Sequence, residues 1–164
     1  MIMFLKPEKI PADIFMQIVR HTPLISIDLL IHNKNNEILL GWRNNQPAKD
    51  YWFVPGGRIY KNETIHDAFA RIMSAETGQA LNIDQADFHG IYEHFHPEQN
   101  FMNEAGFGTH YIVLAFDIQL TGELTSLPVY QHSEYKWQSI ADLLDDTRIH
   151  QYTKNYFNGT RLIG

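Results

Sequence analysis

The segment from Gly57 to Gly78, GRIYKNETIHDAFARIMSAETG, constrains the fold more than any other part of the chain. Thr64 with Asp67 three residues later predicts a capped helix start, and Gly78 is typical of a helix end. Apolar residues at helical spacing predict a stripe that packs against the core: Ile65, Ala68, Phe69, Ile72 and Met73. We therefore expect a loop, a helix and a second loop.

Glu76 continues the same predicted stripe, about three turns after Ile65 at roughly 3.6 residues per turn. A buried carboxylate is costly unless it is paired, protonated or bound to a metal ion. The alternative is a frayed last turn, in which Glu76 meets solvent. The first reading predicts a functional carboxylate on a core-facing helix.

This segment resembles the Nudix box, G-x5-E-x7-R-E-U-x-E-E-x-G-U, where U is aliphatic. The residues at the required offsets are Gly57, Glu63, Arg71, Glu76 and Gly78. Ile72 and Ala75 replace acidic residues of the box, and Gln79 replaces its last aliphatic residue. The box carboxylates ordinarily gather divalent cations that help water attack phosphorus. Their loss here favours fewer metal ions and a different electrophile.

The resemblance extends over nearly the whole chain, through TPLISIDLLI, LLGWRNNQPAKDYWFVPGGR, THYIVLAF and the Gln131-His132 pair. Together these segments are similar to the GDP-mannose mannosyl hydrolase subfamily. The resemblance implies an α/β (α+β) Nudix fold, with a mixed β-sheet between helices. It also implies attack at the sugar carbon of a nucleotide sugar, and a homodimer.

Length and composition predict one domain over residues 1–164, because a chain of 164 residues can bury a substantial core. The formal net charge of -6 argues against nucleic acid or an acidic membrane as a partner. The chain contains no cysteine, which excludes disulfides and thiolate metal sites. Since the apolar runs are short and no signal peptide is visible, we expect a cytoplasmic protein.

Periodicity and turn residues predict the remaining elements. Helices are expected at residues 13–22 and from 140 to 146 and beyond. Strands are expected at residues 24–33, 37–43, 88–95, 110–120 and 135–139.

Glu76 is the expected side-chain ligand of a Mg2+ ion. The resemblance implies that the carbonyl of Gly56 and the side-chain oxygen of Gln131 complete the protein's share. Magnesium keeps several waters and borrows phosphate oxygens, so such a sparse set suits it, with Mn2+ as a substitute. Glu63 is expected to orient the site, through Arg71, rather than to bind the metal.

His132 is the expected general base. Hydrolysis at an anomeric carbon needs water activated on the face opposite the departing diphosphate, and neutral imidazole can do this. Its assignment depends on the preceding Gln131 and on the context PVYQHSEYKW, which matches the subfamily. A surface histidine in a polar loop is the alternative.

Arg43, Arg58 and Arg71 are the candidate cations for the diphosphate, since charge builds up there as GDP departs. Arg71 has a second possible role, that of orienting box carboxylates. For each arginine the alternative is an exposed surface position.

Asp28 is a charge inside the apolar run ISIDLLI, which predicts a substrate hydroxyl or an arginine as its partner. An outward-facing aspartate of an edge strand is the alternative. His94 and Tyr111 match sugar- or phosphate-contacting positions of the subfamily, or are ordinary strand residues. His94 and His96 with His110 or His132 form a less economical zinc-like set.

The predicted reaction is hydrolysis of GDP-mannose to GDP and mannose, with GDP-glucose as a second substrate by resemblance. A single displacement inverts the anomeric centre. One alternative is a Nudix pyrophosphatase that attacks phosphorus in a nucleotide sugar or nucleoside triphosphate. Another is a non-catalytic domain that binds a nucleotide.

Overall fold

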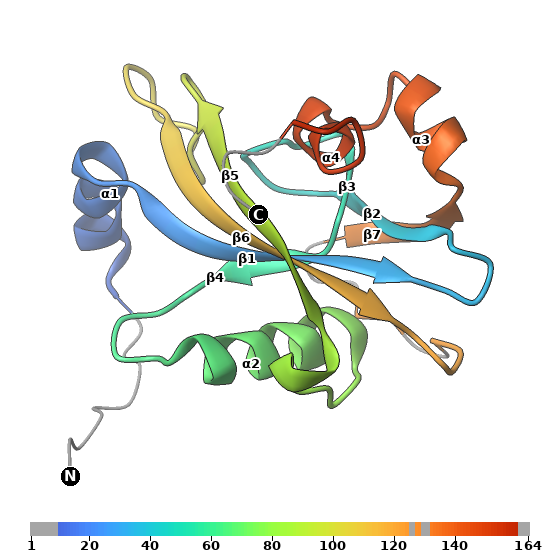
Figure 1. The fold of residues 1–164 in the computed structure, drawn as a ribbon. Coiled ribbons are helices and arrows are strands. Elements are labelled where there is room, and N and C mark those ends of the chain that lie inside the picture. The colour runs from blue at the N-terminus through green and yellow to red at the C-terminus, as the bar shows by residue number, and fades with distance from the viewer. Residues whose placement is uncertain (1–9, 125–126, 129–131, 161–164) are drawn as a thin grey trace, which may run out of the picture.

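A mixed β-sheet with helices on both faces forms the protein, as the computed structural model shows (Figure 1). The structure describes residues 10–124, 127–128 and 132–160. One hydrophobic cluster packs α2 against the sheet, and a second packs the C-terminal helices against the opposite face. The predicted α+β Nudix architecture is confirmed.

The elements follow the sequence pattern closely. The helices are α1 Ala12–His21, α2 Ile65–Thr77, α3 Ile140–Asp145 and α4 Gln151–Asn155, with a 3-10 turn, η1, at Ile83–Gln85. The strands are β1 Leu24–His32, β2 Ile38–Arg43, β3 Trp52–Phe53, β4 Gly56–Arg58, β5 Asp87–His96, β6 Thr109–Gln119 and β7 His132–Gln138. The expected helices and strands are all present. The short strands β3 and β4 were not predicted, because Pro and Gly interrupt that segment.

β1 lies in the middle of the sheet, whose order is β3-β2-β1-β6-β5. It pairs in parallel with β6 and in antiparallel with β2 and β4, while β7 pairs with β2. Asp28 faces Gly56 on one side and Ala115 on the other. The edge-strand alternative for Asp28 is therefore wrong, since its strand is paired on both sides.

α2 has the predicted ends. The Thr64 hydroxyl accepts a hydrogen bond from the Asp67 amide at 3.1 Å, and Gly78 takes the left-handed conformation with φ of 70°. Ala68, Phe69, Ile72, Met73 and Glu76 are buried. Ile65 was wrongly predicted to be part of the stripe, because it is 45% exposed. Helical side chains lean toward the N-terminus, so the first one projects beyond the packed face.

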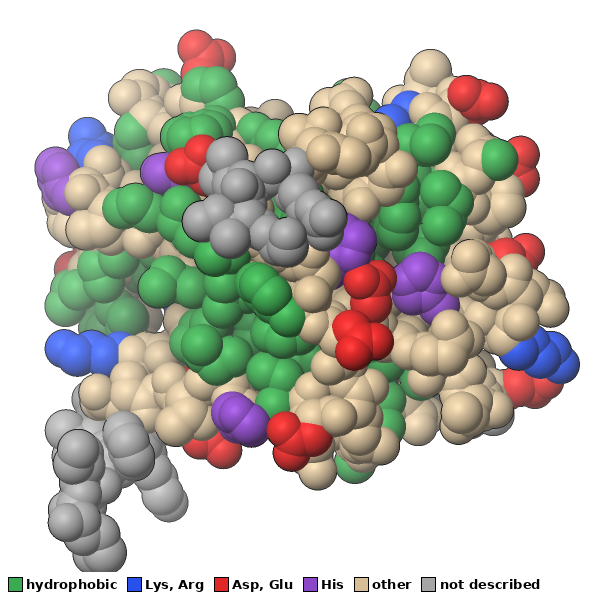
Figure 2. Space-filling model, in the orientation of Figure 1, with side chains coloured by type: hydrophobic (Ala, Val, Ile, Leu, Met, Phe, Trp, Pro, Cys, Tyr) green, Lys and Arg blue, Asp and Glu red, His purple; other side chains and the backbone are tan. Residues whose placement is uncertain are grey.

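The surface shows no concentration of basic residues on the face seen in Figure 2, where lysine and arginine side chains lie scattered toward the margins. Within the described ranges, none of the helices has the length and apolar character needed to cross a membrane.

Candidate active site

A cavity of about 340 Å³ opens between α2 and the strands β1, β2, β4, β5 and β6. It brings together most of the residues predicted from the sequence: Asp28, Arg43, Gly56, Arg58, Arg71, Glu76, His94 and Tyr111. His132 is not among the lining residues and lies behind Glu76. Gln131 lies outside the described residues.

Asp28 is buried at the cavity wall, where it is 6% exposed. The hydroxyl of Tyr156 donates a hydrogen bond to its Oδ2 at 2.6 Å. Burial raises the pKa of Asp28 to about 6, although this hydrogen bond and the charge of Arg43 both act against the rise. Asp28 is thus a carboxylate that changes its protonation state close to neutral pH.

Because Gly56 has no side chain, the Asp28 carboxylate has room beside it. A Cβ at Gly56 would lie 2.5 Å from Oδ1 of Asp28 and 2.7 Å from the carbonyl oxygen of Ile27. Any larger residue would therefore displace either β1 or the carboxylate from the cavity wall.

Glu76 is 5% exposed, which rules out the frayed-turn alternative. Its Oε2 lies 3.5 Å from Nδ1 of His132, a residue that is 1% exposed, so the surface alternative for His132 is also wrong. The Tyr135 hydroxyl lies 3.4 Å from the same Nδ1 and donates its own proton to the carbonyl of Pro128 at 2.6 Å.

These contacts favour one tautomer of His132. Because Nδ1 faces only oxygens that can accept, the arrangement favours a proton on Nδ1 and the lone pair on Nε2. Nε2 is buried and has no hydrogen-bond partner among the described residues. Burial, with the charge of Arg43, lowers the pKa of His132 to about 4, so the ring is neutral at pH 7.

Arg43 and Arg58 supply positive charge to the cavity. Nε of Arg43 donates to the carbonyl of Pro47 at 3.0 Å, and the guanidinium of Arg58 lies 3.9 Å from the ring centre of Phe15 on α1. Burial lowers the pKa of each arginine, yet both remain charged at neutral pH. Tyr111 lies close to both, and burial raises its pKa.

Arg71 forms a bidentate ion pair with Glu63, at 2.6 Å from Nε to Oε1 and 2.8 Å from Nη2 to Oε2. Nη2 also donates to the carbonyl of Arg58, and Oε2 of Glu63 accepts from the amide of Tyr60. These contacts pair Arg71 with a box carboxylate, as the orienting role left open by the sequence requires. Its predicted contact with substrate stays a prediction.

His94 and His96 contribute neutral imidazoles to the cavity lining, and the ring of His150 lies beside that of His96. Burial, with repulsion from His96 and His150, lowers the pKa of His94 to about 3, and His96 and His150 are lowered to about 3 and 4. The ring of His94 stacks on Tyr152 with 4.2 Å between centroids. Neutral rings of this kind can donate to or accept from sugar hydroxyls.

The zinc-like alternative is wrong for the described residues, which bring no three His, Cys, Asp or Glu side chains together around a metal position. The rings of His94 and His96 are 6.5 Å apart. His110 stacks on Phe95, at 4.2 Å between centroids. Phe95 alternates with the two histidines along β5, so its side chain points to the other face of the sheet.

The comparisons with known proteins agree with this geometry. The NUDIX domain family matches residues 22–157. The chain belongs to the Nudix family. The Nudix hydrolase assignment was therefore correct at the level of the family and of hydrolase activity.

Individual proteins also resemble this chain in sequence and in fold. The low-salt glycan biosynthesis protein Agl8 of Haloferax volcanii is 38% identical over 128 residues, which is 78% of each chain. The MutT protein of Methanosarcina mazei Go1 superposes with a TM-score of 0.68 at 25% identity, covering 85% of this chain and 94% of its own. The Nudix domain of Shewanella oneidensis NrtR, solved with ADP ribose, has a TM-score of 0.60 at 14% identity, covering 90% and 96%. At that identity the last likeness shows the fold alone.

The donor set of the cavity fits the divalent cation that Nudix hydrolases generally use. A buried helix carboxylate, Glu76, lines the same wall as Gly56, the residue expected to give a carbonyl oxygen. Two protein oxygens suit magnesium, which takes further ligands from water and phosphate.

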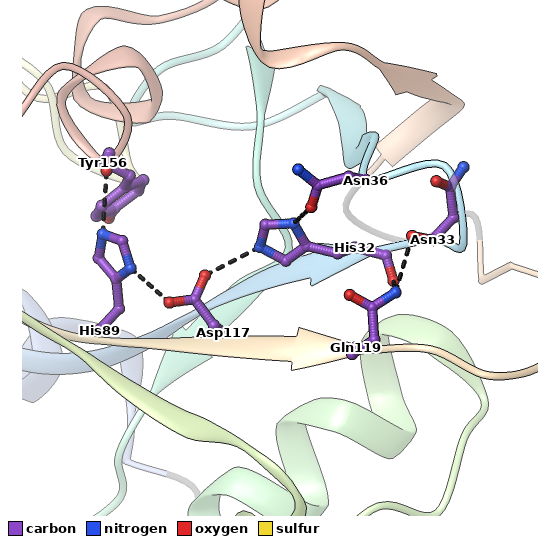
Figure 3. A network of polar contacts seen from close by, with 7 residues as sticks. All are labelled: His32, Asn33, Asn36, His89, Asp117, Gln119 and Tyr156. Atoms are coloured by element: carbon purple, nitrogen blue, oxygen red, sulfur yellow. Dashed lines mark hydrogen bonds and ion pairs between the residues drawn. The ribbon is translucent and has the colours of Figure 1, made fainter.

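Sequence reasoning missed residues that the fold brings to the site from far along the chain. Tyr156 reaches Asp28 across 128 positions, and His96 lines the cavity, although we considered it only as a zinc ligand. Asp117 binds two histidines outside the cavity (Figure 3). Asp117 could have been singled out from the sequence, because it is a charged residue within an apolar strand, as Asp28 is.

Proposed function

We propose that this Nudix protein hydrolyses GDP-mannose, with GDP-glucose as a second substrate, to GDP and free sugar by attack of water at C1. One observation supports the proposal most. Ile72 and Ala75 line the cavity beside Glu76, where the Nudix box has acidic residues. The cavity therefore offers little of the carboxylate cluster that holds several metal ions for attack at phosphorus.

The similarity to Agl8 supports a sugar-linked substrate. Its name places that protein in glycan biosynthesis, a process that consumes activated sugars, and the two chains share 78% of their lengths. The neutral imidazoles of His94 and His96 line the same cavity as Arg43 and Arg58, which suits a ligand that carries both sugar hydroxyls and a diphosphate.

A Mg2+ ion would be held by Glu76, the carbonyl of Gly56 and, as the resemblance implies, Gln131; Mn2+ would substitute. When bound, the ion supplies positive charge that neutralises the diphosphate of the leaving GDP. Arg43 and Arg58 bind the same diphosphate from the cavity wall and favour its departure as charge builds up on it.

His132 acts in this proposal as the general base, through Nε2, the atom that its contacts leave with the lone pair. Nδ1 faces Glu76 and Tyr135, an arrangement that favours the proton on Nδ1. Asp28 and His94 bind sugar hydroxyls, with Tyr111 beside the phosphates. One displacement without a covalent intermediate inverts the anomeric carbon.

The test is product analysis by anion-exchange chromatography after incubation with Mg2+ and GDP-mannose, GDP-glucose or ADP-ribose. GDP from the GDP-sugars supports the proposal. GMP or AMP would instead show a pyrophosphatase, and no turnover of any compound would leave a nucleotide-binding role. A Glu76→Gln variant controls for contaminating hydrolases. A homodimer and a cytoplasmic location remain part of the proposal, and sedimentation velocity tests the first.

A further inference from the structure

One aromatic ring of the cavity lining is exposed to solvent. The lining contains these aromatic side chains: Phe53, Tyr60, His94, His96 and Tyr111. Phe53 and the two histidines are buried and Tyr111 is partly buried, whereas Tyr60, in the loop between β4 and α2, is 39% exposed. Tyr60 therefore lies where the cavity meets solvent, and part of its ring is open to an entering ligand.

Guanidinium groups, and not the hydrophobic core, support the ring of Tyr60. Cζ of Arg71 lies 4.0 Å from the ring centre and Cζ of Arg58 lies 5.2 Å from it. Arg58 in turn lies 3.9 Å from the ring centre of Phe15. Tyr60 belongs to neither hydrophobic cluster of the described residues. Attraction between a cation and an aromatic face thus holds this ring at the surface.

Glu63 holds both partners of this contact. Its Oε2 accepts from the amide of Tyr60 at 2.9 Å, and its two oxygens accept from the guanidinium of Arg71. The amide of Glu63 donates to the carbonyl of Tyr60 at 3.2 Å, which closes a turn. Because one carboxylate holds the backbone of Tyr60 and the guanidinium beneath its ring, the ring is ordered before a ligand binds, which lowers the entropy cost of binding.

The proposed binding mode directs the nucleoside of the substrate toward this ring. In a GDP-sugar the diphosphate separates the sugar from the nucleoside. With the sugar at the buried Asp28 and the diphosphate at Arg58, the nucleoside extends toward the exposed part of the cavity. Tyr60 follows Arg58 by two positions and its ring lies beside that guanidinium. A base attached to the bound diphosphate on this side meets the ring of Tyr60.

A base binds to an aromatic ring by stacking, and the contact accepts any base because every base has a π face. A purine has two fused rings and a pyrimidine has one, so a purine covers more of the tyrosine. Stacking alone does not read the hydrogen-bonding edge that distinguishes guanine from adenine.

We propose that Tyr60 is the platform on which the base of the nucleotide stacks, and that it favours purine over pyrimidine nucleotides without selecting guanine from adenine. The role in GDP-sugar turnover rests on the proposed function, whereas the stacking of a nucleoside diphosphate does not require turnover.

Calorimetric titration with GDP and with inorganic pyrophosphate, each with Mg2+, separates the base from the diphosphate. Tyr60→Ala should weaken GDP binding by between about 5-fold and 150-fold, the effect of losing one base–aromatic stack, and leave pyrophosphate binding unchanged. Tyr60→Phe keeps the ring and should bind GDP as the unaltered protein does. Tyr51→Ala is the matched control, because Tyr51 is 41% exposed but does not line the cavity.

The competing explanation is that Tyr60 only packs the two arginines. In that case Tyr60→Ala weakens GDP and pyrophosphate equally, and this result would overturn the platform. GDP affinity that is the same in Tyr60→Ala and in the unaltered protein would also overturn it. ADP should lose as much affinity as GDP in Tyr60→Ala, and UDP should lose less. Equal losses for UDP and GDP would contradict the purine preference.

Kinetics with GDP-mannose connect the platform to the proposed function. Tyr60→Ala should raise KM and leave kcat nearly unchanged, because the base makes the same contact before and during bond breaking. If GDP binding depends on Tyr60 and GDP-mannose is not hydrolysed, the proposed function fails and the platform stands. If GDP-mannose is hydrolysed and Tyr60→Ala binds GDP as tightly as the unaltered protein, the platform fails and the proposed function stands.

Discussion

Replacement of Gly41 by alanine tests the role of His132 without changing any polar group. A Cβ at Gly41 would lie 2.4 Å from Cγ and 2.5 Å from Cδ2 of His132, where ordinary contacts begin at 3.4 Å. The imidazole must therefore retreat by about 1 Å. A displacement of about 1 Å in a catalytic site costs roughly 100-fold in rate, and overpacking costs about 1–3 kcal/mol of stability.

The assay measures kcat for GDP-mannose and the free energy of unfolding in urea, with Gly122→Ala as the control, because a Cβ at Gly122 meets nothing within 4 Å. In a His132→Ala background, Gly41→Ala should cost much less, since the clashes with Cγ and Cδ2 have gone and only the 3.0 Å approach to the Cβ of residue 132 remains. A Gly41→Ala enzyme with the kcat of Gly122→Ala would refute the assignment of His132 as the base.

Three further predictions follow from the cavity. Asp28→Asn should lower kcat yet raise the free energy of unfolding at pH 7 by up to about 3 kcal/mol, because burial raises the pKa of Asp28 from 3.8 to about 6. Asp28 loses its proton near pH 4 in the unfolded chain but only near pH 6 in the folded protein, so its burial destabilises the fold as pH rises through this interval. Urea titrations should therefore show the stability gain of Asp28→Asn growing between pH 4 and 6 and absent below pH 4. Chelation should abolish turnover reversibly, and Glu76→Gln should raise the Mg2+ concentration for half-maximal rate more than about 10-fold, as loss of even an outer-shell partner can. Arg71→Lys should cost about 2 kcal/mol in thermal unfolding, because lysine cannot make the two parallel bonds to Glu63; an unchanged melting temperature would contradict this.

Local signals in the sequence were sufficient for the helices and the longer strands, but not for the short strands β3 and β4. The Thr64 cap, the Gly78 end and the helical spacing between them defined α2, because each acts within a few residues. Asp28 stood out as a charge in an apolar strand; it is buried, and the hydrogen-bond partner that the structure gives it is Tyr156 rather than an arginine. The failure at Ile65 has a local cause, since a side chain in the first turn points beyond the packed face.

Contacts between distant segments could not be predicted in the same way. The hydrogen bond from Tyr156 to Asp28 depends on the C-terminal segment folding over β1, and no periodicity records that placement. The same holds for His89, whose ring nitrogens contact Asp117 on β6 and the carbonyl of Tyr156 beside α4. Neither the cavity's neutral histidines nor the depth of His132 behind Glu76 was visible before the sheet had been assembled.

The position of bond cleavage is the central claim, and isotope labelling tests it most directly. The protein is incubated with GDP-mannose and Mg2+ in 18O-labelled water, and the products are identified by mass spectrometry. Attack at C1 predicts unlabelled GDP and mannose that carries the label. GMP and mannose 1-phosphate, with the label on a phosphate, would contradict the account and show attack at phosphorus.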